Sequence, residues 1–195
     1  MKTYALALLF AISAHAGEIN LVAQIRTFFA DGAETQRVRF AGTAEDHHVS
    51  IDSDASIEKL ADGTRFTFQK ISTAIVELRP SPVSKDKPIA TENLPEYRKA
   101  ALAQLPVGNR DAKIVEETPD AHPINGWKSL SFTCEYTLNG AKLRSGVTYV
   151  TLAEGPQILM TSRASAEQFE GTAARANSLI RSWFTLKHNQ EPRPS

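Results

Sequence analysis

The clearest pattern of apolar and polar positions lies between residues 126 and 184. From Lys128 to Leu138 apolar residues alternate with polar ones, which is typical of a β-strand with one buried face. Asn139-Gly140 follows directly and favours a two-residue type I′ hairpin turn, because both turn positions take positive φ. Such a turn fixes the register. We therefore expect four cross-strand pairs: Leu138 with Ala141, Tyr136 with Leu143, Phe132 with Val147, and Leu130 with Tyr149.

A third strand and a long helix complete this region. Glu154-Gly155-Pro156 predicts a second turn before a strand at 157–163, and a tight turn would place Tyr149 opposite Met160. Ser165 to Gln168 resembles a capping box at a helix start. Apolar residues then recur at helical spacing: Phe169, Ala173, Ala176, Leu179, Ile180 and Trp183. We expect this helix to lie across the apolar face of the three-stranded meander.

The first half of the chain holds further strands and a shorter helix. Residues 19–29 fit both a helix and a strand, and we favour a helix. Asn93-Leu94-Pro95-Glu96 predicts a helix start with Asn93 as cap. The other predicted elements are a short strand at 37–41, a hairpin of 64–70 with 72–78, a long loop from Pro80 to Glu92, and a strand at 113–118.

The order of these elements is strands, helix, strands, helix. It predicts an α+β fold: an antiparallel sheet with a C-terminal amphipathic helix and a shorter central helix packed on it. No internal repeat or linker divides the chain, so we expect one domain over residues 17–186. Residues 187–195 are polar with two prolines and are predicted to be a disordered tail.

Residues 1–16 have the three parts of a secretory signal peptide. Lys2 is followed by an apolar run from Ala5 to Ile12 and by the cleavage motif Ala14-His15-Ala16. The run is shorter than the roughly 20 residues that cross a bilayer. We therefore predict cleavage near Ala16-Gly17 and a soluble periplasmic or secreted protein without a membrane span.

The charge balance restricts the possible partners, and the cysteine content restricts the possible disulfides. The chain has 22 basic and 22 acidic residues, so it offers no overall positive field for nucleic acid, and we expect no nucleic-acid partner. Cys134 is the only cysteine, which excludes an internal disulfide. Its place on the inward face of a strand predicts a buried, inert thiol.

The sequence carries no recognisable catalytic or cofactor motif. It lacks a G-x-S-x-G elbow, an H-E-x-x-H helix, a phosphate loop, a dinucleotide fingerprint and a C-x-x-C pair. We therefore assign no catalytic, cofactor-binding or metal-binding residue and expect no cofactor. Ser145-Gly146 is interpreted as a strand bulge or bend rather than as a nucleophile.

One cluster has the residue types of a metal site. Glu45-Asp46-His47-His48 is followed by Asp52 and Asp54. Adjacent histidines on a strand point to opposite faces, which disfavours joint ligation. We interpret the cluster as a polar, solvated loop or edge strand, and His122 as an exposed residue in a link.

Several elements together resemble a known superfamily. The Phe66-Thr67-Phe68 strand pairs with Ala74–Leu78, a short helix follows, and a meander led by Trp127 closes on a helix ending in Ser182-Trp183-Phe184. This order, over residues 60–186, resembles the PsbP-like superfamily. That superfamily includes photosystem II extrinsic subunits, a Ran-binding nuclear import factor and exported bacterial proteins of unknown role. An NTF2-like cone is the alternative α+β fold.

The resemblance implies a binding or accessory factor rather than an enzyme. We therefore expect an exported, non-enzymatic module that binds an unknown protein or small ligand. Its contact surface would be the sheet face that the helices leave uncovered, or the Pro80–Glu92 loop. One alternative is a secreted, metal-dependent hydrolase that uses His47 and His48. Another is a purely structural envelope protein.

Overall fold

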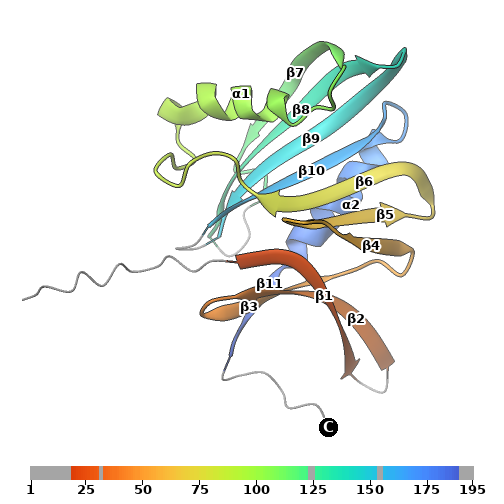
Figure 1. Ribbon diagram of the computed structural model, residues 1–195, viewed down its shortest axis with the longest axis vertical. Coiled ribbons are helices and arrows are strands. Elements are labelled where there is room, and N and C mark those ends of the chain that lie inside the picture. The colour runs from red at the N-terminus through yellow and green to blue at the C-terminus, as the bar shows by residue number, and fades with distance from the viewer. Residues whose placement is uncertain (1–18, 31–32, 123–125, 153–155, 189–195) are drawn as a thin grey trace, which may run out of the picture.

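The protein has an α+β fold, as predicted. The computed structural model describes residues 19–30, 33–122, 126–152 and 156–188 (Figure 1). The predicted signal peptide and residues 189–195 lie outside the described residues. The strands are β1 (Ile19–Ala30), β2 (Ala33–Gly42), β3 (Glu45–Ser50), β4 (Ala55–Lys59), β5 (Thr64–Phe68), β6 (Ile71–Pro80), β7 (Arg110–Pro119), β8 (Lys128–Leu138), β9 (Ala141–Thr151), β10 (Gln157–Ser165) and β11 (Phe184–Lys187). The helices are the 3-10 turn η1 (Thr91–Asn93), α1 (Leu94–Ala103) and α2 (Phe169–Arg181).

These strands form two antiparallel sheets. The small sheet has the order β1-β2-β3-β11, and the large sheet has the order β4-β5-β6-β10-β9-β8-β7. Figure 1 shows the small sheet lying beyond the β4 end of the large one. The helix expected at 19–29 is wrong, because these residues pair with β2 as β1. Lys187, placed in the disordered tail from sequence, instead ends β11.

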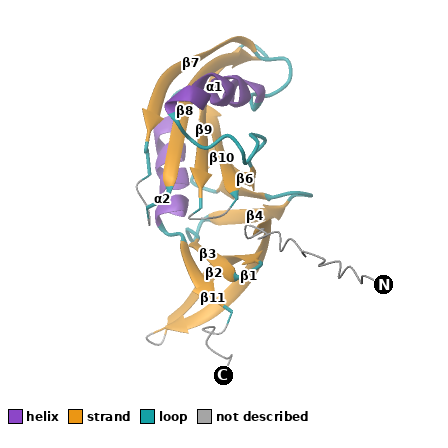
Figure 2. Cartoon of the chain, turned by 90° about the vertical axis from the view of Figure 1, so that its left-hand side faces the viewer, coloured by secondary structure: helices purple, strands orange, loops and turns teal. Residues whose placement is uncertain are grey.

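The large sheet carries an apolar cluster on each face, at opposite ends. Towards β7, α1 covers one face and buries Tyr97 and Ala101 against Phe132, Cys134 and Tyr149. Nearer to β4, α2 and the small sheet cover the other face, with Ala176, Leu179, Ile180 and Trp183 among Val38, Phe40, Phe66, Val76, Ile158 and Met160. Figures 1 and 2 show the two helices on opposite sides of the sheet.

This arrangement corrects one prediction about packing. The C-terminal helix does not cover the Phe132 face of the meander, because α1 takes that place. None of the helices within the described residues has the length and apolarity needed to cross a membrane.

The β8–β9 hairpin has the predicted register. All four expected pairs occur, from Leu138 with Ala141 to Leu130 with Tyr149. The turn residues Asn139 and Gly140 have φ of 51° and 81°, as a type I′ turn requires. The next register differs from the prediction by one residue: Tyr149 lies opposite Leu159, and Met160 lies opposite Thr148. Met160 therefore belongs to the α2 face.

One of the two predicted helix starts is confirmed and the other is wrong. Asn93 is the N-cap of α1, although its side-chain amide donates to the carbonyl of Pro88 (2.9 Å) rather than capping the helix. Ser165 is still part of β10, and α2 begins four residues later at Phe169. The capping box predicted at Ser165–Gln168 is therefore wrong. The backbone N–H of Gln168 instead donates to the Ser165 carbonyl, 3.1 Å away, in a turn.

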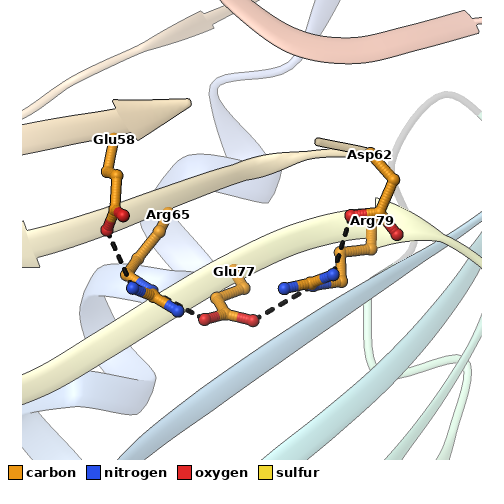
Figure 3. Close-up of polar contacts among 5 residues, drawn as sticks. All are labelled: Glu58, Asp62, Arg65, Glu77 and Arg79. Carbon is orange, nitrogen blue, oxygen red and sulfur yellow. Dashed lines mark hydrogen bonds and ion pairs between the residues drawn. The ribbon is translucent and has the colours of Figure 1, made fainter. Parts of the chain in front are cut away.

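Opposite the α2 core, the β4–β6 end of the large sheet carries a chain of alternating charges (Figure 3). Arg65 donates to Glu58 (2.8 Å) and Glu77 (2.7 Å), and Arg79 donates to Glu77 (3.2 Å) and Asp62 (2.7 Å). Burial would raise the pKa of Glu77, but the hydrogen bonds and charges of Arg65 and Arg79 outweigh it and lower that pKa. The network joins three neighbouring strands where no helix covers them.

Candidate functional site

A polar groove lies where the large sheet leaves the cover of α2. Its volume is about 560 Å³, and it runs between β7–β10 and the first half of the helix. The strands contribute five hydroxyl groups, from Thr118, Ser131, Thr133, Thr148 and Ser162. Phe169, Ala173 and Asn177 line it from α2, and Met160 adds an apolar patch. This is the size of a small-ligand site.

The alternation of β8 and β9 builds this groove. The odd positions of β8 from Ser131 to Glu135 face the groove, while the even positions are buried under α1. At Gly146, a Cβ would lie 2.6 Å from the Ser162 hydroxyl oxygen and 3.6 Å from Cζ of Phe169. Glycine is therefore needed where β9 passes close to β10 and α2. The bulge or bend predicted at Ser145-Gly146 is wrong, because both residues pair in unbroken register with β8.

The charged side chains of the groove are mostly acidic. Glu116, Glu135 and Glu170 line it together with a single arginine, Arg144. Arg144 donates to Glu135 at 2.7 Å and lies 3.9 Å from Glu170. Hydrogen bonds from Arg144 lower the pKa of Glu135. The lining therefore holds three carboxylates against one guanidinium, which favours a ligand with positive charge or hydrogen-bond donors.

His122 lines the groove and is buried, whereas the sequence predicted exposure. Its side chain is 5% exposed, and its backbone N–H donates to the Ser129 hydroxyl at 2.8 Å. Burial, together with the charge of Arg181, lowers the pKa of the imidazole. The ring is thus neutral at pH 7, and its Nδ1 has no hydrogen-bond partner among the described residues.

The histidine pair His47-His48 lies elsewhere and does not form a site with His122. Both histidines are buried on β3, between β2 and β11, so the predicted solvated loop or edge strand is wrong. They do point to opposite faces: Nδ1 of His47 accepts a hydrogen bond from Trp183, and His48 stacks on Phe184 at 5.1 Å. Burial is the largest influence on both pKa values and lowers them.

Asp52 and Asp54, which follow these histidines in the sequence, form ion pairs with α2. Arg175 on α2 forms ion pairs with Asp52 (2.6 Å) and Asp54 (3.4 Å). Within the described ranges, no group of three or more His, Cys, Asp or Glu side chains could hold a metal ion. The single cysteine, Cys134, is buried as predicted, and burial raises the pKa of its thiol to about 11.

Part of the groove could be predicted from the residue pattern. The polar positions of β8 were expected on a face opposite Phe132, but the helix was expected on the Phe132 side. The wall that α2 adds therefore could not be foreseen. The groove lies between the sheet and α2, so neither expected contact surface, the face free of helices or the Pro80–Glu92 loop, forms it. The Pro80–Glu92 loop connects β6 to η1 as predicted.

Comparisons with known proteins identify the fold. No family model matches the sequence, and no curated protein sequence matches it. Cyanobacterial PsbP (CyanoP) from Synechocystis sp. PCC 6803 is similar in structure, with a TM-score of 0.50 and 11% identity over 85% of this chain and 94% of that one. LpqN of Mycobacterium tuberculosis, involved in cell envelope biogenesis, has a TM-score of 0.48 and 11% identity over 84% of this chain and 91% of its own. PA94 of Pseudomonas aeruginosa, of unknown function, has a TM-score of 0.46 and 13% identity over 88% of this chain and 99% of its own. At such low identity the likeness concerns the fold alone, and the chain has the PsbP-like fold that its sequence resembled.

Proposed function

We propose that the protein is an exported, non-enzymatic binding module that holds a polar ligand in the groove beneath α2. The observation that carries this proposal is the groove itself. A sheet face that could have been closed by apolar side chains is instead lined by hydroxyl groups, carboxylates and His122. Export is supported by the signal-like pattern of residues 1–16.

The lining suggests the chemistry of the ligand. Carboxylates outnumber guanidinium groups by three to one, and the hydroxyl oxygens and neutral His122 can accept as well as donate hydrogen bonds. A ligand that carries an amino or guanidinium group and several polar atoms matches this set. A short basic peptide segment of an envelope protein is such a ligand.

Two substitutions on neighbouring positions of α2 test whether binding occurs in the groove. Ala173 lines the groove, whereas Ala174 is exposed and does not. Ala173→Phe should fill the groove, and Ala174→Phe is its matched control. Fluorescence anisotropy with pooled short peptides of net charge +2, 0 and −2 would measure binding. We expect the +2 pool to bind the wild type and A174F equally, and A173F at least tenfold more weakly.

The result has clear alternatives. Equal binding by A173F and A174F would place the ligand elsewhere, and absence of binding by any pool would count against a peptide-binding module. Export is tested separately by the intact mass of the protein recovered from the cell envelope. We expect a mature chain that begins at Gly17. A chain that retains residues 1–16 in the cytoplasm would contradict export.

A further inference from the structure

A second, smaller hollow lies on the opposite face of the same strands. Its volume is about 60 Å³, and it is lined by β6, β9, β10 and by Gln104 at the end of α1. Its strand residues, such as Thr161, alternate with those of the groove, such as Ser162, so the two sites face in opposite directions. About 10–15 Å³ of such space holds one water molecule, so the hollow admits a group of a few heavy atoms and not a whole ligand.

The charged residues of Figure 3 border this hollow and are paired with one another. Glu77 and Arg79 belong to the lining of the hollow. Oε1 of Glu77 accepts from Arg65 at 2.7 Å, and Oε2 accepts from Arg79 at 3.2 Å. The outer ends of the chain are the carboxylates of Glu58 and Asp62. Both oxygens of Glu77 therefore already have an arginine as donor.

Arg163 also lines the hollow but lies outside this charge chain. On β10 it is opposite Ser145 of β9 and Ile75 of β6, in the interior of the large sheet. The side chain is half-buried, and its guanidinium has no ion-pair or hydrogen-bond partner within residues 19–30, 33–122, 126–152 and 156–188. A cation in this position has lost part of its hydration, which a bound anion would replace.

Hydroxyl and amide groups accompany Arg163 in the hollow. Thr161 precedes it by two residues on the same face of β10, and Gln104 adds a side-chain amide. The Ser145 hydroxyl donates to the Tyr136 hydroxyl at 3.2 Å. Burial raises the pKa of Tyr136, while the hydrogen bond from Ser145 and the charge of Arg163 act to lower it. The guanidinium is therefore close enough for its charge to act on these hydroxyl groups.

We propose that Arg163, together with Thr161 and Gln104, binds a carboxylate group in this hollow. The guanidinium fork matches the two oxygens of a carboxylate with paired hydrogen bonds. The Thr161 hydroxyl and the Gln104 amide can each donate a further one. Because the hollow admits a group of this size only, the rest of the ligand lies outside it. The carboxylate can belong to a small organic acid or to the C-terminus of a peptide.

The charge of the lining favours a carboxylate over a phosphate. Burial would raise the pKa of Glu77, but the hydrogen bonds and charges of its two arginine partners lower it, so Glu77 is ionised at neutral pH. A phosphate monoester carries close to two negative charges, and the second would be repelled by Glu77. A carboxylate carries a single charge, which Arg163 alone neutralises.

Titration followed by ¹H–¹⁵N NMR at pH 7.5 tests the proposal. The probes are acetate, N-acetylalanine, the uncharged N-acetylalanine amide and inorganic phosphate, with chloride at equal ionic strength as the reference. We expect acetate and N-acetylalanine to shift, saturably, the backbone amide signals of β10 and one arginine Nε–Hε signal that is missing from Arg163→Gln. The amide signals of R163Q should report carboxylate binding at least tenfold weaker. Thr161→Val should weaken it about fivefold.

Arg110→Gln is the matched control, because it removes an exposed arginine on β7 outside the hollow. R110Q should bind carboxylates like the wild type. R163Q breaks no ion pair of the described residues, so its melting temperature by circular dichroism should equal that of the wild type. Tighter binding of N-acetylalanine than of acetate assigns a peptide C-terminus, and equal or weaker binding assigns a small organic acid.

Four results would overturn the proposal. They are the absence of a saturable shift with any carboxylate, unchanged carboxylate binding by R163Q, binding of the N-acetylalanine amide as tight as that of the acid, and tighter binding of phosphate than of acetate. The groove beneath α2 takes no part in this site, so the outcome does not depend on the peptide binding proposed above.

Discussion

The indole Nε1 of Trp183 donates a hydrogen bond to Nδ1 of His47, 3.2 Å away, where both side chains are buried. The bond joins the end of α2 to the centre of the small sheet. It requires His47 to be neutral, with its proton on Nε2, because a doubly protonated imidazole could not accept. Trp183 also stacks on Phe40, with ring centroids 5.5 Å apart, and meets Trp127 edge-on at 6.1 Å.

Acidification should weaken the fold through this bond. Burial lowers the pKa of His47, although Glu45 and Asp46 act to raise it. In the unfolded chain the imidazole titrates near its ordinary value of 6.5. Between the two values the unfolded state binds more protons, so stability is complete above pH 6.5 and falls as the pH drops below it. Urea denaturation at pH 7.5 and 5.5 should show this loss. His47→Gln should lose less than the wild type over the same interval, and an equal loss would contradict the role of His47.

Trp183 should be the costliest single truncation in the interface between the sheets. Trp183→Ala removes a 3% exposed side chain from the larger core and should lower the free energy of unfolding by about 3–5 kcal/mol. Trp183→Phe keeps much of the packing but leaves Nδ1 of His47 without its donor, and should cost about 1–3 kcal/mol. Urea titration followed by far-ultraviolet circular dichroism measures both. Equal costs would show that packing contributes nothing beyond the hydrogen bond.

Gly146 should tolerate a side chain only when Ser162 is removed. Gly146→Ala places a methyl group 2.6 Å from the Ser162 hydroxyl oxygen and should cost about 1–3 kcal/mol. In the Ser162→Gly background the same change should cost less, so the two effects should not add. Urea midpoints of the two single variants and the double variant give the coupling. Strict additivity would mean that the strand relaxes away from Ser162.

Glu77 should be the most important member of the charge chain in Figure 3. Its side chain is 15% exposed and bridges Arg65 and Arg79, whereas Glu58 is 58% exposed and contacts Arg65 alone. Glu77→Gln should lower stability by about 1–3 kcal/mol, and Glu58→Gln by about 0.2–1 kcal/mol. Because the pKa of Glu77 is lowered, the difference should be present at pH 7 and shrink as the pH falls through that pKa. Chemical denaturation at pH 7 and pH 3 tests both statements.

Sequence reasoning succeeded where structure is decided locally. The β8–β9 register follows from Asn139-Gly140 and from the alternation on either side, and both lie within one hairpin. The β9–β10 register failed because Ile158, Leu159 and Met160 are all buried, so apolar character does not distinguish the two faces of the strand. Five residues, 152–156, separate the paired residues Thr151 and Gln157, whereas the pair of Tyr149 with Met160 requires an even number. A one-residue slip then moved Met160 to the other face.

Features built by distant segments were the ones missed. His47 and His48 look like surface residues in their own segment, and they are buried by Trp183 and Phe184, about 136 positions further along the chain. The groove depends on α2 crossing one face of the sheet while α1 covers the other, a choice that no local pattern records. The α+β class, by contrast, follows from element order alone.

The two apolar cores lie on opposite faces of β10. Ile158 and Met160 enter the larger apolar cluster, and Leu159 between them enters the smaller one. A substitution that leaves a cavity in one core shifts the β10 backbone, and the next residue of that strand is packed in the other core. The loss of packing therefore extends to both cores. Although each helix has its own cluster, calorimetry should record one melting transition and not two.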